Sequence, residues 1–307
     1  MNFDLGQIRP GSAAAWWLAI RPLTLPASMA PVLLGWALAA YQSTAPVDLA
    51  FACLAVAGLL QIAANLANDY GDARSGVDGT DRLGPIRVTQ SGLLSRRQVL
   101  AGLMLCMALA AAAGMYAVAQ TGWWLLLLGA VCMVAALAYT AGPWPLSRIG
   151  MGEVAALVFF GPVACTGTYA TLTGTTTPAA WCAGFVPGLH AAAIMAVNNL
   201  RDITGDRRAG KQTLAVCLGE DRARRLAMGL LLLGNLTVTP LALTTVHRAL
   251  WASLALAPLS LPLLRAMHFT PRSAELNKVL ARTGRWALLT CLVIAALLHQ
   301  PFYPSSG

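Results

Sequence analysis

Charged and acidic side chains are scarce in this sequence. Only 12 of its 307 residues are Asp or Glu, and Asp, Glu, Lys and Arg together make up 11%. Hydrophobic residues make up 57%, and the mean hydropathy is +0.64. Soluble globular domains carry roughly 25% charged residues. The composition therefore excludes a soluble globular protein and indicates a membrane protein.

Paired metal-ligating side chains are also missing. The seven cysteines occur singly, with no Cys-x-x-Cys pair, and the four histidines have no zinc-site spacing. We expect the cysteines to be small packing residues within helices. His190 is expected either to carry a proton or to be a hydrogen-bonded interior residue.

Apolar runs of about 20 residues fill most of the chain, which is the length that a membrane-spanning helix needs. The runs lack the alternation of barrel strands, so helices are favoured. We predict an all-α integral membrane protein in which the first span is kinked or lies in the interface at Pro22 and Pro26. The nine predicted spans are about 15–40, 47–70, 98–119, 122–141, 151–173, 178–202, 225–246, 249–267 and 283–300.

Lys and Arg are concentrated in alternate connections between these spans. The connections near 43–46, 120–121 and 174–177 have none, whereas 71–97, 142–150, 203–224 and 268–282 hold nearly all, with Arg248 the main exception. The positive-inside pattern predicts a cytoplasmic N-terminus and an external C-terminus. The net charge of +9 is explained by topology and contact with anionic lipids of the bilayer, not by nucleic-acid binding.

The end of the second predicted span carries a polar face. Asn65, Asn68, Asp69 and Asp72 fall at i, i+3, i+4 and i+7, so one side of a helix presents all four. Asp78 and Asp81 follow on a Gly-containing loop, where Asp81 could also cap the next turn. The basic residues interleaved with these acids are Arg74, Arg82 and Arg87.

The sixth predicted span ends in a second cluster, in which Asn198, Asp202 and Asp206 repeat at i+4. Its other polar members are Asn199, Arg201, Arg207, Arg208 and Lys211. Crowded carboxylates repel one another unless a cation neutralises them, and Mg²⁺ is commonly held by a few carboxylates, waters and substrate phosphates. The neighbouring cations suit phosphate oxygens. Both clusters are predicted at cytoplasmic helix ends, so we predict one metal–diphosphate site between them.

An alternative reading is that charged residues at helix ends anchor spans at the headgroup level. It suits Arg96, Arg97, Arg222, Arg224, Arg225, Arg272, Lys278 and Arg282. It does not suit Asp69 and Asp72, because Asn65 and Asn68 extend the polar face into the span. Polar groups inside a membrane are costly and usually mark a functional site.

Several long motifs resemble one family. The segments NDYGDARSGVD and DRLGPIRVTQSG, together with NNLRDITGDRRAGKQTLAVCLG, resemble the two signature regions of the UbiA superfamily of intramembrane prenyltransferases. RPLTLPASMAPVLLG at 21–35 and YTAGPWPLSRIGMGEVAALVFFGPV at 139–163 are similar to its naphthoate branch, which serves menaquinone biosynthesis. The resemblance implies one domain over 1–307, with a core at 16–300, nine helices around a central cavity, and a bacterial cytoplasmic (inner) membrane location.

The resemblance also implies an activity: Mg²⁺-dependent transfer of a polyprenyl group from polyprenyl diphosphate to 1,4-dihydroxy-2-naphthoate, with decarboxylation. Asp69, Asp72 and Asp78 match the first metal-binding motif, and Asp202 and Asp206 match the second. The superfamily has its third acid where this chain has Gly76, so Asp78 takes that role. The residues expected to bind substrate are Asn65, Asn68, Arg74, Arg87, Arg148, Glu153, Asn198, Asn199, Arg201 and Lys211.

The chemistry requires an apolar and aromatic cavity, because the allylic cation must be kept from water and is favoured by ring faces. Tyr139, which occupies a family motif position, is the expected catalytic aromatic residue. Phe159, Phe160 and Tyr169 are further candidates, for which ordinary helix packing is the alternative. We expect Arg148, Glu153 or Arg201 to orient the acceptor, although Arg148 stands where the family has a less basic residue.

Three alternatives remain at this point. Another enzyme of the same superfamily would use 4-hydroxybenzoate or haem as acceptor. A CDP-alcohol phosphotransferase also uses Asp-rich helices, but the spacing in GDARSGVDGTD does not fit its signature. A cation transporter would need acids near the bilayer midplane, whereas these lie at one face.

Overall fold

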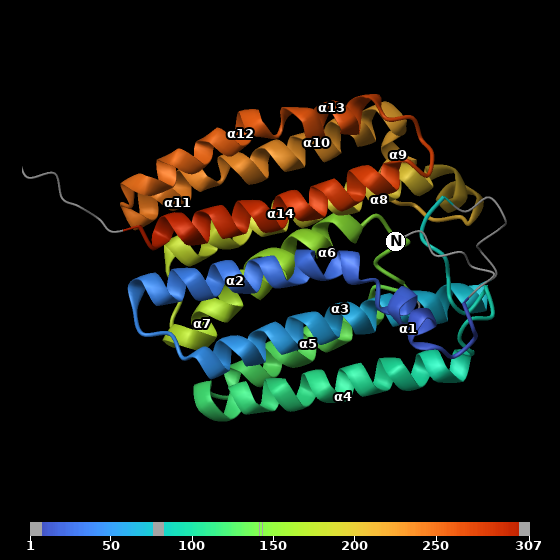
Figure 1. Ribbon diagram of the computed structural model, residues 1–307, viewed down its shortest axis with the longest axis horizontal. Helices are drawn as coiled ribbons and strands as arrows, with labels where there is room; N and C mark the ends of the chain where they lie inside the picture. The colour runs from blue at the N-terminus through green and yellow to red at the C-terminus, as the bar shows by residue number, and fades with distance from the viewer. Residues whose placement is uncertain (1–7, 76–82, 141, 143, 301–307) are drawn as a thin grey trace, which may run out of the picture.

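The computed structural model describes residues 8–75, 83–140, 142 and 144–300, with the backbone alone at 72–75. Every regular element in these ranges is a helix. The long helices lie side by side along the longest axis, and their ends gather at two opposite faces (Figure 1). The all-α prediction is therefore confirmed.

Eight helical segments of the described chain are long and apolar enough to cross a membrane. Four are single helices: α3 (Val47–Ser75), α4 (Arg96–Thr121), α8 (Pro178–Arg208) and α14 (Leu276–Leu298). Each of the other four consists of consecutive shorter helices. The first contains α1 (Ala13–Ile20), η2 (Pro22–Thr24) and α2 (Leu25–Gln42), and the second contains α6 (Gly152–Val158), η3 (Phe159–Thr166) and α7 (Gly167–Thr173). The third contains α10 (Glu220–Leu236) and α11 (Val238–Thr245), and the fourth contains η4 (Arg248–Ala255), α12 (Leu256–Leu259) and α13 (Leu261–Phe269). A short helix, α9 (Leu214–Leu218), follows α8.

The remaining predicted span, 122–141, coincides with α5 (Trp124–Ala138), which is apolar but has only 15 residues. At 1.5 Å per residue it is about 22 Å long. A straight crossing of the hydrocarbon core takes about 30 Å. The structure thus provides eight candidate spans and one shorter apolar helix, and a ninth crossing stays a prediction.

The predicted interruption of the first span lies at Arg21. Arg21 caps α1 with φ of 54°, in the left-handed region, and Pro22 then opens η2. Proline cannot donate a backbone hydrogen bond to continue α1. The chain therefore turns at this point, and the turn brings Arg21 to the inside of the bundle.

Helix α8 approaches the broken segment α6–η3 so closely that only glycine fits. A Cβ atom on Gly188 would lie 2.5 Å from the carbonyl oxygen of Leu157, and one on Gly161 would lie 2.7 Å from the carbonyl oxygen of Gly184. The η3 segment is a π-helix that contains Pro162, and Gly161 in it has non-helical backbone angles. Small residues that allow backbones to meet are a common way to join helices in membranes.

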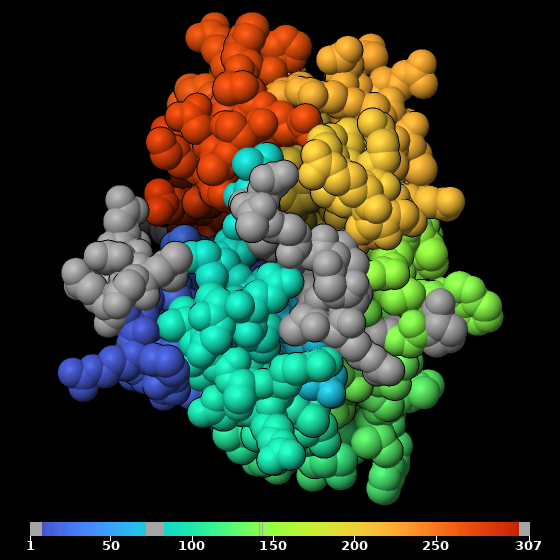
Figure 2. Space-filling view, turned by 90° about the vertical axis from the view of Figure 1, so that its right-hand side faces the viewer, coloured from blue at the N-terminus to red at the C-terminus, as the bar shows by residue number. Residues whose placement is uncertain are grey.

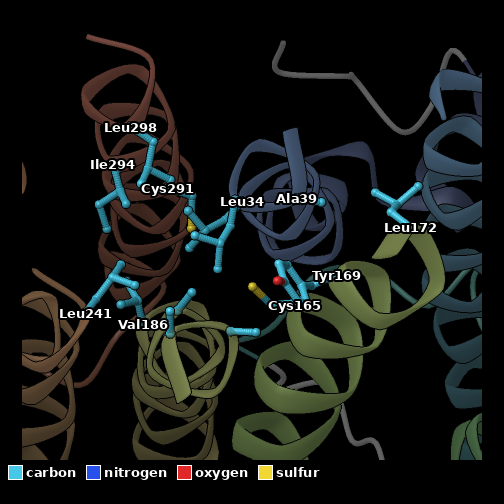
Figure 3. Packing of buried hydrophobic residues seen from close by; sticks show 14 of the residues in the cluster. Leu34, Ala39, Cys165, Tyr169, Leu172, Val186, Leu241, Cys291, Ile294 and Leu298 are labelled. Carbon is cyan, nitrogen blue, oxygen red and sulfur yellow. The ribbon is translucent and has the colours of Figure 1, made fainter. Parts of the chain in front are cut away.

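The largest hydrophobic cluster joins α2, α8, α14 and the η3–α7 segment. Leu34, Cys165, Val186 and Ile294 from these elements are all buried, and Figure 3 shows their side chains facing a common centre. Helices α4 and α5 contribute little to this cluster. Helix α4 packs instead against α3 in a separate buried cluster, which includes Leu66 and Leu103.

A buried polar group joins four elements beyond this cluster. His190 Nε2 lies 3.1 Å from Asn235 Oδ1, which also accepts a hydrogen bond from Trp286 Nε1 at 3.0 Å. Asn235 Nδ2 donates to Ser260 Oγ at 3.2 Å. His190 is thus a hydrogen-bonded interior residue, one of its two predicted roles, and it ties α8 to α10 and α14.

Candidate active site

A cavity of about 1150 Å³ runs between the helices. One face of α3 lines the cavity from Ala52 to Asn68, a stretch of about 24 Å at helical rise. The face consists of Ala52, Cys53, Val56, Ala57, Leu60, Gln61, Ala64, Asn65 and Asn68. These positions repeat with helical spacing and change from small apolar residues to amides. The cavity therefore has an apolar end and a polar end.

We call the polar end of the cavity the polar mouth. It is lined by Asn68, Arg87, Asp202, Asp206 and Lys211. The first two come from α3 and the segment after residue 82, and the others from α8 and the turn that follows it. Figure 2 views the bundle from this end, where teal, gold and orange-red segments meet. The structure thus brings the ends of both motif helices to one cavity, as the sequence predicts.

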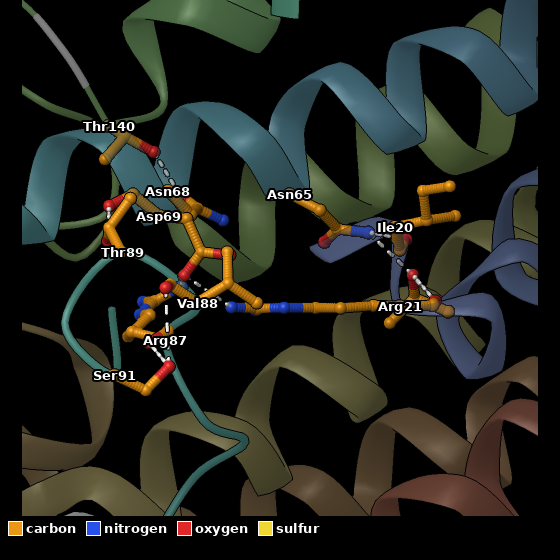
Figure 4. A network of polar contacts seen from close by, with 11 residues as sticks. Ile20, Arg21, Asn65, Asn68, Asp69, Arg87, Val88, Thr89, Ser91 and Thr140 are labelled. Atoms are coloured by element: carbon orange, nitrogen blue, oxygen red, sulfur yellow. Dashed lines mark hydrogen bonds and ion pairs between the residues drawn. The ribbon is translucent and has the colours of Figure 1, made fainter. Parts of the chain in front are cut away.

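Asp69 lies beneath the mouth between two guanidinium groups (Figure 4). Its Oδ1 is 3.4 Å from Arg21 Nη2 and 3.6 Å from Arg87 Nη1, and the side chain is completely buried. Thr89 donates to its carbonyl oxygen at 3.0 Å. A buried charge is tolerated only when it is paired. In this structure Asp69 holds two cations in place and does not line the cavity, so its role as a metal ligand stays a prediction.

Asn65 and Asn68 connect α3 to its neighbours. Asn65 Nδ2 donates to the carbonyl oxygen of Ile20 and to Thr24 Oγ1, both at 3.0 Å. Asn68 Oδ1 accepts a hydrogen bond from Thr140, which follows α5. These amides position the walls of the mouth, and both also face the cavity.

Arg201 organises the second motif. It donates from Nε and Nη2 to both carboxylate oxygens of Asp202, at 2.8 and 2.5 Å. Its other hydrogen bonds reach Asn198 Oδ1 at 2.8 Å and Asn277 Oδ1 at 2.7 Å, and the residue is only 2% exposed. Asn277 in turn donates to the carbonyl oxygen of Leu83 at 2.8 Å. Bidentate Arg–carboxylate pairs fix geometry, so Arg201 positions Asp202.

Asp206 and the cations around it complete the mouth. Asp206 Oδ1 is 2.9 Å from Lys211 Nζ. Arg208 and Arg272 also line the cavity. Arg272 donates to Thr204 on α8, so its expected role as a headgroup anchor is wrong. Its guanidinium belongs to the wall of the mouth.

Arg224, which was also expected to anchor a span at the headgroup level, has a different role. It is buried, donates to the carbonyl oxygen of Met267 at 2.8 Å, and pairs with Glu220 at 2.7 Å. Its bond to Met267 joins α10 to α13, and its burial leaves little of the side chain open to a lipid headgroup.

Aromatic residues line the cavity below the mouth. Tyr139, Phe159 and Phe160 face it, as predicted, and the Tyr139 hydroxyl donates to Met195 Sδ at 3.1 Å. Tyr169 does not line it; it is buried in the α2–α8 cluster and donates to Gln42, so of its two expected roles it has the packing one. Tyr169 stands nine residues after Phe160, which is about 180° around a regular helix, so it lies on the opposite side from Phe160.

The expected acceptor-orienting residues differ in position. Glu153 is buried behind Asn199, whose Nδ2 donates to Glu153 Oε1 at 3.0 Å, and Asn199 lines the cavity. Arg201 is committed to Asp202, as described above. Arg148 is absent from the cavity lining among the described residues, and its carbonyl oxygen accepts a bond from Gln212 N at 2.7 Å.

Some predicted site residues cannot be compared with the structure. Asp78 and Asp81 lie outside the described residues, and for Asp72 and Arg74 only the backbone, in the last turn of α3, is described. Among the described side chains no three His, Cys, Asp or Glu gather as a metal-binding group. Mg²⁺ needs only one or two carboxylates when substrate phosphates and water complete its shell. The oxygen donors of Asn198, Asp202 and Asp206, all facing the cavity, fit that requirement.

Sequence reasoning missed Arg21, Thr140 and Asn277 as site residues. A signal existed for Arg21, because it stands within a 30-residue apolar segment, Ala13–Gln42, where a charge is costly. Thr140 and Asn277 act through partners that are distant in sequence. No local pattern distinguishes them from ordinary polar residues at a helix end.

We predict that Arg87→Met destabilises the protein by about 2–4 kcal/mol, because it removes a guanidinium partner of a fully buried carboxylate. Thermal unfolding in detergent measures the change. The double variant Asp69→Asn/Arg87→Met should recover part of the loss, since the uncompensated charge is gone. Independent, additive effects of the two changes would contradict the pairing.

Residues 28–289 match the model of the UbiA prenyltransferase family. The chain belongs to this family. A UbiA relative from Escherichia coli, named 1,4-dihydroxy-2-naphthoate octaprenyltransferase, is 38% identical, and the match covers 93% of this chain and 96% of the relative. A protein of the same name from Mycobacterium tuberculosis is 39% identical, over 94% of this chain and 97% of the relative.

The UbiA fold is also found among solved structures. A UbiA homologue from Archaeoglobus fulgidus, bound to GPP and Mg²⁺, superposes with a TM-score of 0.68 at 15% identity, over 93% of this chain and 100% of the other. The family assignment makes the protein a multi-pass membrane protein and a prenyltransferase. It leaves no place for the phosphotransferase and transporter alternatives.

Proposed function

We propose that this protein transfers a polyprenyl group from polyprenyl diphosphate to 1,4-dihydroxy-2-naphthoate, with loss of CO₂, as the prenylation step of menaquinone biosynthesis. The observation that carries the proposal is one continuous cavity with carboxylates and cations at one end and apolar and aromatic walls beyond them. The UbiA relatives named for this activity match nearly the whole chain. Like the cavity, a polyprenyl diphosphate has one charged end and one long apolar end.

The diphosphate belongs at the polar mouth. Asp202 and Asp206, with Asp72 and Asp78 from the first motif, are the residues that would hold Mg²⁺, the metal bound together with GPP in the structure of the Archaeoglobus fulgidus homologue. The bound metal supplies charge neutralisation for the leaving diphosphate. Arg87, Lys211 and the other cations of the mouth offer hydrogen bonds to the remaining phosphate oxygens.

The reaction breaks the allylic C–O bond, and the electron pair leaves with the diphosphate. The ring carbon that bears the carboxylate attacks the allylic carbon, and the C–CO₂ bond then returns its electron pair to the ring. Tyr139, Phe159 and Phe160 surround the path of the cation and exclude water from it. Fixed cations that meet the growing charge of the diphosphate lower the barrier.

The acceptor belongs between the mouth and the aromatic wall, next to Asn199. Glu153 fixes the amide of Asn199 from behind, and its own Oε2 has no hydrogen-bond partner in the described part of the chain. A buried carboxylate oxygen without a partner is costly. Glu153 does not itself line the cavity, so it would orient the acceptor through the Asn199 amide, which supports Glu153 over Arg148 for this role.

The positive-inside pattern supports a bacterial cytoplasmic-membrane location with the polar mouth toward the cytoplasm. The basic connections that the pattern assigns to the cytoplasm lie at the same end of the bundle as the mouth (Figure 1). Water-soluble diphosphate product would then leave directly into the cytoplasm. The N-terminus would be inside and the C-terminus outside.

Mass spectrometry of products tests the function. Purified protein in lipid nanodiscs is given octaprenyl diphosphate with 1,4-dihydroxy-2-naphthoate or 4-hydroxybenzoate. We expect a decarboxylated prenyl-naphthalenediol from the first acceptor and no product from the second. EDTA should stop the reaction and added Mg²⁺ restore it. Product from 4-hydroxybenzoate alone would assign the protein to another branch of the family.

We predict that Glu153→Gln raises the acceptor KM about tenfold, since Asn199 loses its hydrogen bond to a charged group, and such a bond contributes about 1.5–3 kcal/mol. The donor KM should stay the same because the diphosphate does not contact this position. Steady-state assays with each substrate varied in turn separate the two values. Val154→Ala, at an exposed neighbouring position outside the cavity, is the control. A rise of the donor KM instead would place Glu153 at the diphosphate.

A further inference from the structure

Helix α14 supplies a polar residue to the mouth, although the helix carries neither motif. Asn277 is the second residue of α14 and lines the cavity. Leu276 and Val279 beside it are buried in a hydrophobic cluster that joins α14 to α8, α10 and α13. Because these two apolar residues fix the first turn of α14, the side-chain amide of Asn277 is held at the edge of the polar mouth.

The amide of Asn277 is bonded to both motif regions. Its Oδ1 accepts a hydrogen bond from Arg201 Nη1 at 2.7 Å, and its Nδ2 donates to the carbonyl oxygen of Leu83 at 2.8 Å. Arg201 belongs to the second motif. Leu83 belongs to the segment that follows the first motif and leads to Arg87. One side chain thus joins the two regions whose acids and cations line the mouth.

On the α8 side, Asn277 completes the set of partners of Arg201. Nε and Nη2 of Arg201 donate to Asp202, and Nη1 donates to Asn277. The Arg201 side chain is nearly fully buried, so little water can reach it in place of a missing acceptor. A buried donor without an acceptor is costly, and a guanidinium that turns to find one gives up its bidentate geometry on Asp202. Asn277 therefore maintains the orientation of the Asp202 carboxylate.

On the other side, Asn277 anchors the segment that carries Arg87. The far end of this segment is held on α3, where Thr89 donates to the carbonyl oxygen of Asp69 at 3.0 Å. The near end is held on α14 by the bond from Asn277 to Leu83. Arg87 lies between these two attachments and lines the mouth. Without the bond to Leu83, the backbone at Arg87 would be held from one side only.

We propose that Asn277 is a positioning residue for the diphosphate. Its amide fixes the carboxylate half of the site through Arg201, and it fixes the half that contains Arg87 through the carbonyl oxygen of Leu83. This inference rests on the proposed function and specifies how the two halves of its diphosphate site are kept in register. Asn277 acts through its partners, so its replacement weakens the binding of Mg²⁺ and diphosphate while every metal-binding carboxylate stays in the chain.

The test compares Asn277→Leu and Asn277→Asp with wild type in lipid nanodiscs. Leucine removes both hydrogen bonds, whereas aspartate keeps an acceptor for Arg201 and turns an oxygen toward the carbonyl oxygen of Leu83. Calorimetric titration with farnesyl diphosphate at saturating Mg²⁺ gives the donor Kd without an acceptor present. Assays with 1,4-dihydroxy-2-naphthoate give the acceptor KM and the Mg²⁺ concentration at half-maximal rate.

We expect the donor Kd to rise about tenfold in Asn277→Leu, the size of effect that one lost hydrogen bond to a charged group produces. In Asn277→Asp it should rise several-fold, because the segment before Arg87 is released. The Mg²⁺ concentration at half-maximal rate should rise in Asn277→Leu alone, since only there does Arg201 lose an acceptor. The acceptor KM should stay within about twofold of wild type in both variants. The matched control is Lys278→Leu, at the next position of α14, exposed and outside the cavity lining.

Three outcomes would overturn the proposal. One is a donor Kd and a Mg²⁺ requirement that are unchanged in folded Asn277→Leu, with or without a loss of thermal stability. Another is an acceptor KM that rises as much as the donor Kd. The third applies where Asn277→Leu does not fold, and it is a wild-type donor Kd in folded Asn277→Asp. Failure of the proposed function is separate, because wild type would then bind farnesyl diphosphate and Mg²⁺ without prenylating the naphthoate.

Discussion

Replacing Asp202 with Asn is expected to lower prenyl transfer by about 10³-fold or more, because a carboxylate of the metal–diphosphate site is lost. Asp202 lines the polar mouth and is held by two hydrogen bonds from Arg201. Asparagine keeps the size and one acceptor oxygen but not the charge. Asp206→Asn should have a similar effect. Rates are measured by mass spectrometry at saturating donor and Mg²⁺.

The control for this pair is Asp48→Asn. Asp48 lies at the other end of α3, is exposed, and accepts a hydrogen bond from Tyr116 outside the cavity. Activity should be unchanged in this variant. Size-exclusion chromatography and thermal unfolding establish that all three variants are folded. Normal turnover by folded Asp202→Asn would refute the site.

Replacing Gly188 with Leu is expected to prevent the native packing of α8 on α6. The Cβ position is 2.5 Å from a backbone carbonyl oxygen, which cannot move aside like the end of a side chain. Overpacking of a well-packed core costs about 1–3 kcal/mol or more. Most of the expressed protein should therefore aggregate or unfold at lower temperature, as measured by fluorescence-detected chromatography.

Gly229→Leu on α10 provides the matched comparison. A Cβ there meets no atom within 4 Å, so the change adds a side chain without a clash. Leucine is also a better helix former than glycine, by up to about 1 kcal/mol. Its thermal stability should equal or exceed that of wild type. If Gly188→Leu and Gly229→Leu had the same thermal stability, α8 and α6 could move apart without loss of the fold.

Most helices were predictable from the sequence because a membrane imposes a minimum length on apolar runs. The nine expected segments coincide with eight candidate spans and α5. Hydropathy does not report the π-helix at η3, since π-helices arise from tertiary packing and local proline and glycine geometry.

The acids of the site were predictable from spacing, but their partners were not. Asn198, Asp202 and Asp206 share a helix face by simple periodicity, and all three line the cavity. The pairing of Asp69 with Arg21 depends on a turn of the chain 48 residues earlier. Such a pair follows from tertiary structure, and no local pattern contains it.

The three attachments of α8 have a consequence for substrate binding. Its glycines are in backbone contact with α6 and η3, His190 is bonded to Asn235 of α10, and Arg201 to Asn277 of α14. A shift of this helix would break all of these together. It therefore serves as a fixed reference frame, and adjustment to ligands of different bulk falls to the elements opposite it, α3, α4 and α5. Relatives could diverge in donor preference through those elements while the catalytic carboxylates keep their positions.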